Sequence, residues 1–107
     1  MSQFDDREKG EEARFVMTAE LEFKAHARCN KLLGIWAAEL MSLAGDEARA
    51  YAADVVAADF AESGDEDVFK KVSADLKAKG LTVPDAVIRQ KIAQLASLAR
   101  QQIMSEG

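Results

Sequence analysis

His26 and Cys29 are the residues of this sequence whose side chains could most readily bind a metal ion. They lie three positions apart, and residues at this spacing share one face of a helix. A structural zinc site needs four ligands, mostly Cys and His, whereas the chain contains one Cys and one His. We therefore interpret His26 as a partly exposed side chain and Cys29 as a buried core residue, and we predict no metal site.

Other candidate chemistry fails on its missing partners. Residues 64–68, GDEDV, lack the remaining ligands of a calcium-binding EF-hand loop. A carboxylate-bridged metal pair needs Glu-x-x-His from two helices, whereas the chain contains one His. The chain has no phosphate-binding loop ending in Gly-Lys-Ser/Thr. Cys29 has no orienting group that would make it a nucleophile. We predict a protein that is not an enzyme and needs no cofactor.

Length and charge restrict the class of protein further. The 107 residues are enough for one domain, and a net charge of −5 argues against binding to nucleic acid or to an anionic membrane. A single cysteine suits a reducing compartment. The polar, acidic N-terminus is unlike a signal peptide, and the longest apolar run, residues 32–38, is too short to cross a bilayer. We expect a cytoplasmic protein without direct membrane insertion.

The elements that position these residues are helices. The first is predicted from Thr18 to Gly45, where Gly45 would adopt the left-handed conformation of a C-cap. Gly34 lies inside it and predicts the close approach of a neighbouring helix, since glycine otherwise costs a helix about 1 kcal/mol. The helix's apolar stripe, at spacings of three and four, consists of Ala25, Cys29, Leu32, Trp36, Leu40 and Leu43.

Three further amphipathic segments follow. The second helix lies between Gly45 and Gly64, with the stripe Ala48, Tyr51, Ala52, Val55, Val56 and Phe60. The third opens with a capping box of Ser63 and Glu66 and ends at Gly80; its stripe is Val68, Phe69, Val72 and Leu76. The fourth opens with Thr82 as N-cap, and its stripe is Ile88, Ile92, Leu95, Ala99 and Ile103.

These segments predict an all-α fold, a four-helix bundle over residues 18–107 preceded by an arm of residues 1–17. In the arm, eight of the twelve residues from Phe4 to Phe15 are charged. One interpretation is a solvated tail. The other is a segment that becomes helical on binding, because Asp5 and Lys9 are spaced for a helical ion pair and aromatic residues are common interface anchors. A segment this short is not a stable helix alone.

Three stretches of the sequence carry a resemblance. Residues 4–8 (FDDRE), 30–40 (NKLLGIWAAEL) and 51–72 (YAADVVAADFAESGDEDVFKKV) resemble the zeta subunit, the ATPase inhibitor subunit of alphaproteobacterial rotary ATP synthases. The resemblance covers nearly the whole chain and is weakest after Gly80. It implies a four-helix protein that binds the catalytic sector and inhibits ATP hydrolysis, because an N-terminal segment enters a catalytic interface between subunits and wedges against the rotor.

The resemblance also implies where the partner binds. Phe4 to Glu8 match the family's arm motif, and Phe15 matches its later aromatic residue, while Gly10-Glu11 replaces a better helix former and a bulky apolar residue. We expect a monomer when free, with partner-binding residues Phe4, Asp5, Asp6, Arg7, Glu8, Lys9, Arg14 and Phe15. The alternative is a bundle that binds a small molecule, such as an adenine nucleotide, and does not inhibit.

Overall fold

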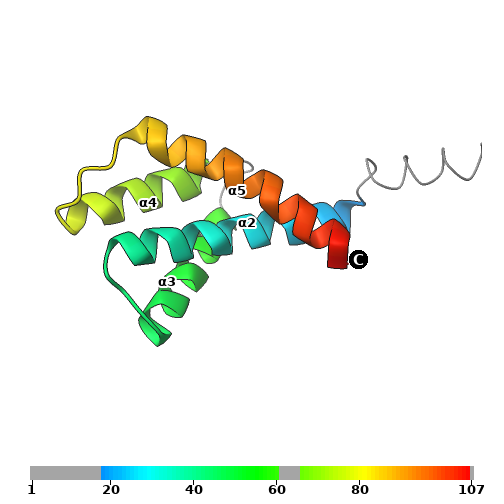
Figure 1. The fold of residues 1–107 in the computed structure, drawn as a ribbon, viewed down its shortest axis with the longest axis horizontal. Coiled ribbons are helices and arrows are strands. Elements are labelled where there is room, and N and C mark those ends of the chain that lie inside the picture. The colour runs from blue at the N-terminus through cyan, green and yellow to red at the C-terminus, as the bar shows by residue number, and fades with distance from the viewer. Residues whose placement is uncertain (1–17, 61–65, 107) are drawn as a thin grey trace, which may run out of the picture.

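Four α-helices form the protein in the computed structural model (Figure 1), which describes residues 18–60 and 66–106. The predicted all-α, four-helix arrangement is confirmed, and no strand occurs in these two ranges. The elements, in chain order, are α2 (Ala19–Leu40), α3 (Asp46–Ala57), the short 3₁₀ helix η1 (Ala58–Phe60), α4 (Glu66–Ala78) and α5 (Asp85–Glu106).

Helix α2 is the centre of the arrangement. It packs mainly against α3 and α5, and α5 runs antiparallel to it, so that the end of α5 lies beside the start of α2 (Figure 1). Helix α4 lies beside the first half of α5 (Figure 1). The core therefore joins all four helices around Leu33, Val55, Val72 and Ile88, each of which is completely buried.

The stripes predicted for α4 and α5 are confirmed. Both helices rest on the core with one face, and every residue of the two stripes is buried: Val68, Phe69, Val72 and Leu76 on α4, and Ile88, Ile92, Leu95, Ala99 and Ile103 on α5. Such one-sided packing is the case in which periodicity alone identifies the buried residues.

The stripe predicted for α2 is wrong in part. Leu40 is 40% exposed, and Leu32 and Trp36 are only partly buried. The buried residues of α2 are instead Ala25, Cys29, Asn30, Leu33, Gly34, Ala37 and Ala38. The reason is that α2 packs on two sides, so a second face made of small residues is buried against α3. On α3, Ala52 and Val55 are buried as predicted.

The end of α2 also differs from the prediction. The helix stops at Leu40, and Gly45 instead precedes α3. Ser42 has φ 64°, and the N–H of Leu43 donates to the carbonyl of Ala38 over 2.9 Å. This is a Schellman motif with serine at the left-handed position that glycine usually occupies.

Of the predictions for the other helix ends, two are confirmed and one is wrong. Thr18 is the N-cap of α2, as predicted, and its Oγ1 accepts a hydrogen bond from the N–H of Leu21 over 3.1 Å. Gly80, with φ 77°, follows α4 as predicted. The Thr82 cap is wrong, because the carbonyl of Pro84 accepts from the N–H of Ile88 over 3.3 Å and α5 begins only at Asp85. Ser63 lies outside the described residues.

Gly34 confirms the predicted close approach. A Cβ atom at this position would lie 2.6 Å from the Cα of Ala52 and 3.3 Å from the Cβ of Val55. Because Ala52 meets it with backbone, no side-chain rotation can relieve the overlap. Glycine at position 34 therefore sets the distance between α2 and α3.

Gly34→Ala tests this contact. Alanine raises helix propensity by about 1 kcal/mol, whereas overpacking costs about 1–3 kcal/mol. Since the overlap is with backbone, we expect a net loss of about 1–2 kcal/mol in the free energy of unfolding, measured with urea. Ala50→Gly, at an exposed position of α3, is the propensity control and should cost about 1 kcal/mol. A Gly34→Ala protein that is more stable than the original would contradict the contact.

Candidate functional site

The predicted partner-binding residues belong to the arm, and the structure describes the base from which the arm leaves. This base is the start of α2 with the end of α5. These eight residues lie outside the described part of the chain and so remain predictions. They are Phe4, Asp5, Asp6, Arg7, Glu8, Lys9, Arg14 and Phe15.

The first turn of α2 is a capped helix N-terminus. Thr18 is extended, with φ −68° and ψ 162°, and its carbonyl accepts the N–H of Glu22 over 2.9 Å. Glu20 and Glu22 lie in the first turn, where negative charge is favourable beside the positive end of the helix dipole. The backbone direction is therefore fixed where the arm meets the bundle.

Arg28 joins this start of α2 to the last turn of α5. Its Nη1 and Nη2 each donate to one carboxylate oxygen of Glu106 over 2.9 Å, and Nη1 also donates to Oε1 of Gln102 over 2.7 Å. Such two-pronged pairs fix orientation as well as distance. The hydrogen bond lowers the pKa of Glu106 and raises that of Arg28. We call Arg28, Gln102 and Glu106 the terminal clasp.

A second polar cluster ties η1 to α2. Oδ2 of Asp59 lies 2.5 Å from Nε2 of His26 and accepts from Nδ2 of Asn30 over 3.2 Å. Asn30 is only 2% exposed, and a buried amide requires such a partner. Sequence reasoning missed Asn30, because most other polar residues of the same helix are exposed and nothing in the sequence distinguishes Asn30 from them. His26 thus has a structural role here.

Cys29 is buried, as predicted, and its Sγ lies 3.8 Å from the carbonyl oxygen of Ile92. His26 and Cys29 both border a cavity of about 230 Å³ between α2 and α5, with Arg100 on the α5 side. Within residues 18–60 and 66–106, no group of three or more His, Cys, Asp and Glu side chains could hold a metal ion.

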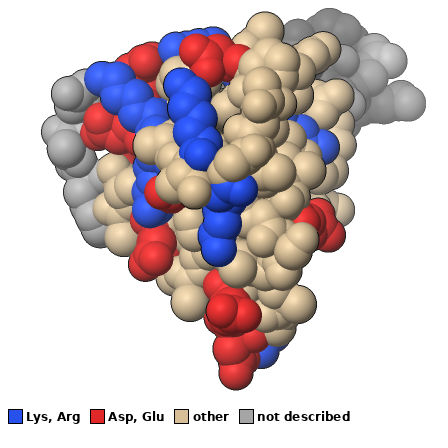
Figure 2. Space-filling view, turned by 90° about the vertical axis from the view of Figure 1, so that its left-hand side faces the viewer, with Lys and Arg blue, Asp and Glu red and all other residues tan. Residues whose placement is uncertain are grey.

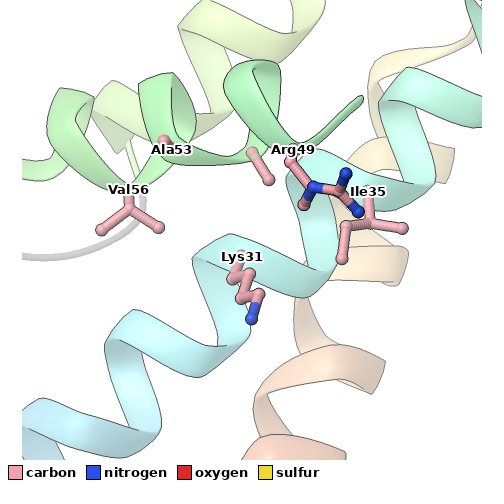
Figure 3. Close-up of a pocket in the computed structure, with 6 residues that line it drawn as sticks. Lys31, Ile35, Arg49, Ala53 and Val56 are labelled. Carbon is pink, nitrogen blue, oxygen red and sulfur yellow. The ribbon is translucent and has the colours of Figure 1, made fainter. Parts of the chain in front are cut away.

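A larger cavity of about 420 Å³ lies between α2 and α3 (Figure 3). Its lining is apolar apart from two basic residues, Lys31 of α2 and Arg49 of α3, and Arg49 also pairs with Asp46. This cavity could not be predicted from the sequence, because it arises from how the small residues of α3 lie over α2. The apolar lining is Ile35, Ala52, Ala53 and Val56.

Basic side chains gather at the end of the bundle where α4 leads to α5 (Figure 2). On these helices Arg89 binds Glu66 over 3.1 Å and Lys71 binds Asp75 over 3.1 Å. Asp75 also accepts from the hydroxyl of Tyr51 over 2.8 Å, and burial followed by this hydrogen bond raises the pKa of Tyr51. Arg89 and Lys71 are therefore paired within the molecule.

Comparison with known proteins decides the family. The family model described as ATPase inhibitor subunit zeta matches residues 1–102. The chain belongs to this family. The match spans the arm as well as the bundle, and it confirms the resemblance seen in the sequence.

A solved relative supports the fold described above. A solution NMR structure is 50% identical, with a TM-score of 0.72, and the match covers 81% of this chain and 99% of that one. No curated protein matches the chain. Among the helices of the described ranges, none is sufficiently long and apolar to span a membrane.

The terminal clasp is tested with Arg28→Ala. We expect severalfold faster amide hydrogen exchange in residues 102–106, because the last turn of α5 loses its link to α2. Since the folded pKa of Glu106 is lowered, the clasp's contribution should be complete above the ordinary pKa of 4.5 and disappear as pH falls through the lowered value. Arg100→Ala, whose partner Glu22 is 4.0 Å away, is the control. Equal exchange in both variants would contradict the clasp.

Proposed function

We propose that this zeta-family chain is a non-catalytic regulatory subunit that binds the catalytic sector of a bacterial rotary ATP synthase and inhibits ATP hydrolysis. The observation that carries the proposal is the family match, which names an ATPase inhibitor subunit and includes residues 1–17. The protein would reach the membrane-bound synthase from the cytoplasm, through protein contacts alone, and would be a monomer when free.

The inhibitory element in this proposal is the arm. It enters the interface between catalytic subunits, becomes helical there and blocks the rotation that hydrolysis requires. Phe4 and Phe15 supply apolar contact, because aromatic side chains are favoured anchors in interfaces. The charged residues set the register of the arm, since complementary charge contributes more to orientation than to affinity; they are Asp5, Asp6, Arg7, Glu8, Lys9 and Arg14.

The bundle acts as the stop outside the interface. The capped start of α2 fixes where the arm begins, and the terminal clasp holds α5 beside that start. A bundle with all four helices in one core does not deform to follow the arm. The bundle then limits how far the arm enters.

Deletion of residues 1–14 tests the arm. We expect the shortened chain to unfold at the same urea concentration as the full chain, because Thr18 and its cap to Leu21 remain. It should lose inhibition of ATP hydrolysis by a purified alphaproteobacterial catalytic sector, since nothing then enters the interface. The measurement is the hydrolysis rate at increasing concentrations of either chain.

Two results of this experiment would change the proposal. Full inhibition by the shortened chain would exclude the arm as the inhibitory element. If the full chain binds without inhibiting, Gly10→Ala becomes the control, because it should strengthen an inserted helix by about 1 kcal/mol. If the Gly10→Ala variant inhibits ATP hydrolysis, the arm mechanism is supported. If this variant also fails to inhibit, the arm mechanism is excluded.

The cavity between α2 and α3 favours a second candidate function, binding of a small molecule such as an adenine nucleotide. Its volume of about 420 Å³ lies in the range of small-ligand sites. Its apolar lining suits a planar ring, and Lys31 and Arg49 at its border suit phosphate groups. This function would need no arm.

Titration with ADP or ATP tests the second function. We expect amide chemical-shift changes to concentrate around Lys31 and Arg49, because these cations would meet the phosphates. Lys31→Ala should raise the dissociation constant about tenfold, the loss expected for one charged hydrogen bond, whereas Lys24→Ala, exposed on the same helix, should not. Shifts that are spread evenly or absent would exclude the cavity as a nucleotide site.

A further inference from the structure

Phe23 is the most exposed large apolar side chain in the described part of the protein. It is 73% exposed, whereas the other four exposed large hydrophobic residues, Leu40, Val87, Leu98 and Met104, lie between 36% and 43%. Removing a phenylalanine side chain from water is favourable in proportion to the apolar area that is covered. A residue this exposed loses that contribution in the free protein and regains it on any partner that covers the ring.

The position of Phe23 on α2 explains why it is uncovered. Residues 23, 27, 30 and 34 recur at spacings of four, three and four, so they share one helix face. Farther along α2, this face packs on α3, where Gly34 meets Ala52. Toward Phe23, the last described part of this covering segment is η1, whose Asp59 accepts a hydrogen bond from Asn30.

The residues around Phe23 are suited to contact with the surface of another protein. Ala19 and Ala27, one turn to either side, are small, so a partner can approach the helix closely around the ring. Glu20, three residues before Phe23, is exposed and has no ion partner in the described ranges. Glu22 has only the distant Arg100, at 4.0 Å. An apolar side chain beside two carboxylates, one without an ion partner in the described ranges and one with a long pair of 4.0 Å to Arg100, is complementary to an apolar pocket with basic residues at its edge.

The location of Phe23 relative to the arm identifies the partner. Phe23 is five residues after Thr18, about 8 Å along the helix axis at 1.5 Å per residue. A protein that receives the arm therefore faces this turn of α2 as well. The terminal clasp, which begins at Arg28, keeps the turn fixed in the bundle.

We infer that Phe23 is a second anchor, which inserts into an apolar pocket with a basic edge on the catalytic sector, beside the entry of the arm. The inference rests on the proposed function, because the arm determines which partner is near. Phe23 contributes affinity and residence time, whereas the arm produces inhibition. Hot-spot residues of interfaces are typically aromatic side chains of this kind, buried in a pocket of the partner.

The test uses the full chain with Phe23→Ala and a purified alphaproteobacterial catalytic sector. We expect the apparent dissociation constant to rise about 10- to 100-fold, in the range of hot-spot truncations. Maximal inhibition at saturating concentration should stay unchanged, because the arm is intact. Phe23→Leu should recover part of the affinity. Leu98→Ala, a similarly truncated exposed residue on α5, is the matched control and should leave binding unchanged.

The two readouts separate this inference from the proposed function. If the full chain binds but never inhibits, the arm mechanism fails while the affinity of Phe23→Ala still decides the anchor. Unchanged affinity of Phe23→Ala overturns the anchor. So does a lower urea midpoint of the free variant with unchanged affinity, because Phe23 would then be covered by its own chain. Absence of any binding by the full chain overturns both.

Discussion

The contact between Gly34 and Ala52 is the constraint on which the arrangement depends. It allows α2 and α3 to approach until backbone meets backbone, and it leaves the opposite side of α2 free to pack on α5. Because α2 and α3 lie this close together, a helix buried on two sides cannot carry large side chains on both of them. The α3 side of α2 is therefore small, with Gly34 and Ala38, and the α5 side carries Cys29 and Leu33.

This two-sided burial also accounts for the polar ties of the fold. Helix α3 with η1 covers only part of α2, and where it ends, Asp59 is held by Asn30 and His26. Beyond that point α5 is the described element that accompanies α2, and the clasp from Arg28 to Glu106 joins the two. The first turns of α2 are consequently fixed on the α5 side and open on the α3 side. The open side is where Phe23 lies.

How far the sequence predicts the fold depends on how many faces a helix buries. One face was enough for α4 and α5, whose predicted stripe residues are all buried, although the buried Ser73 of α4 was not among them. For α2, large apolar residues were given preference, so the buried Asn30 was not assigned to the core, whereas Gly34 was predicted as a point of close approach. The helix ends follow the same logic: Gly80 was predicted because glycine favours positive φ, whereas Ser42 adopts it without such a signal.

The candidate site was predictable to a different extent. The arm's charges and aromatic residues are visible in the sequence, and the family match includes them. The terminal clasp pairs residues 78 positions apart, a distance at which charge spacing carries no information. The cavity between α2 and α3 depends on packing angles that periodicity does not determine. Phe23 could have been noticed only once the stripe of α2 had been placed correctly.

In the mechanism that we propose, the arm becomes helical only on binding, and this has a thermodynamic cost that the bundle is suited to offset. Fixing the backbone costs about 1–2 kcal/mol per residue, so an arm of this length uses much of its contact energy for its own ordering. An anchor on α2 has its backbone already ordered and contributes its burial almost undiminished. An inhibitor built from an arm and a rigid bundle therefore gains affinity most efficiently at their junction, and Phe23 stands at that place.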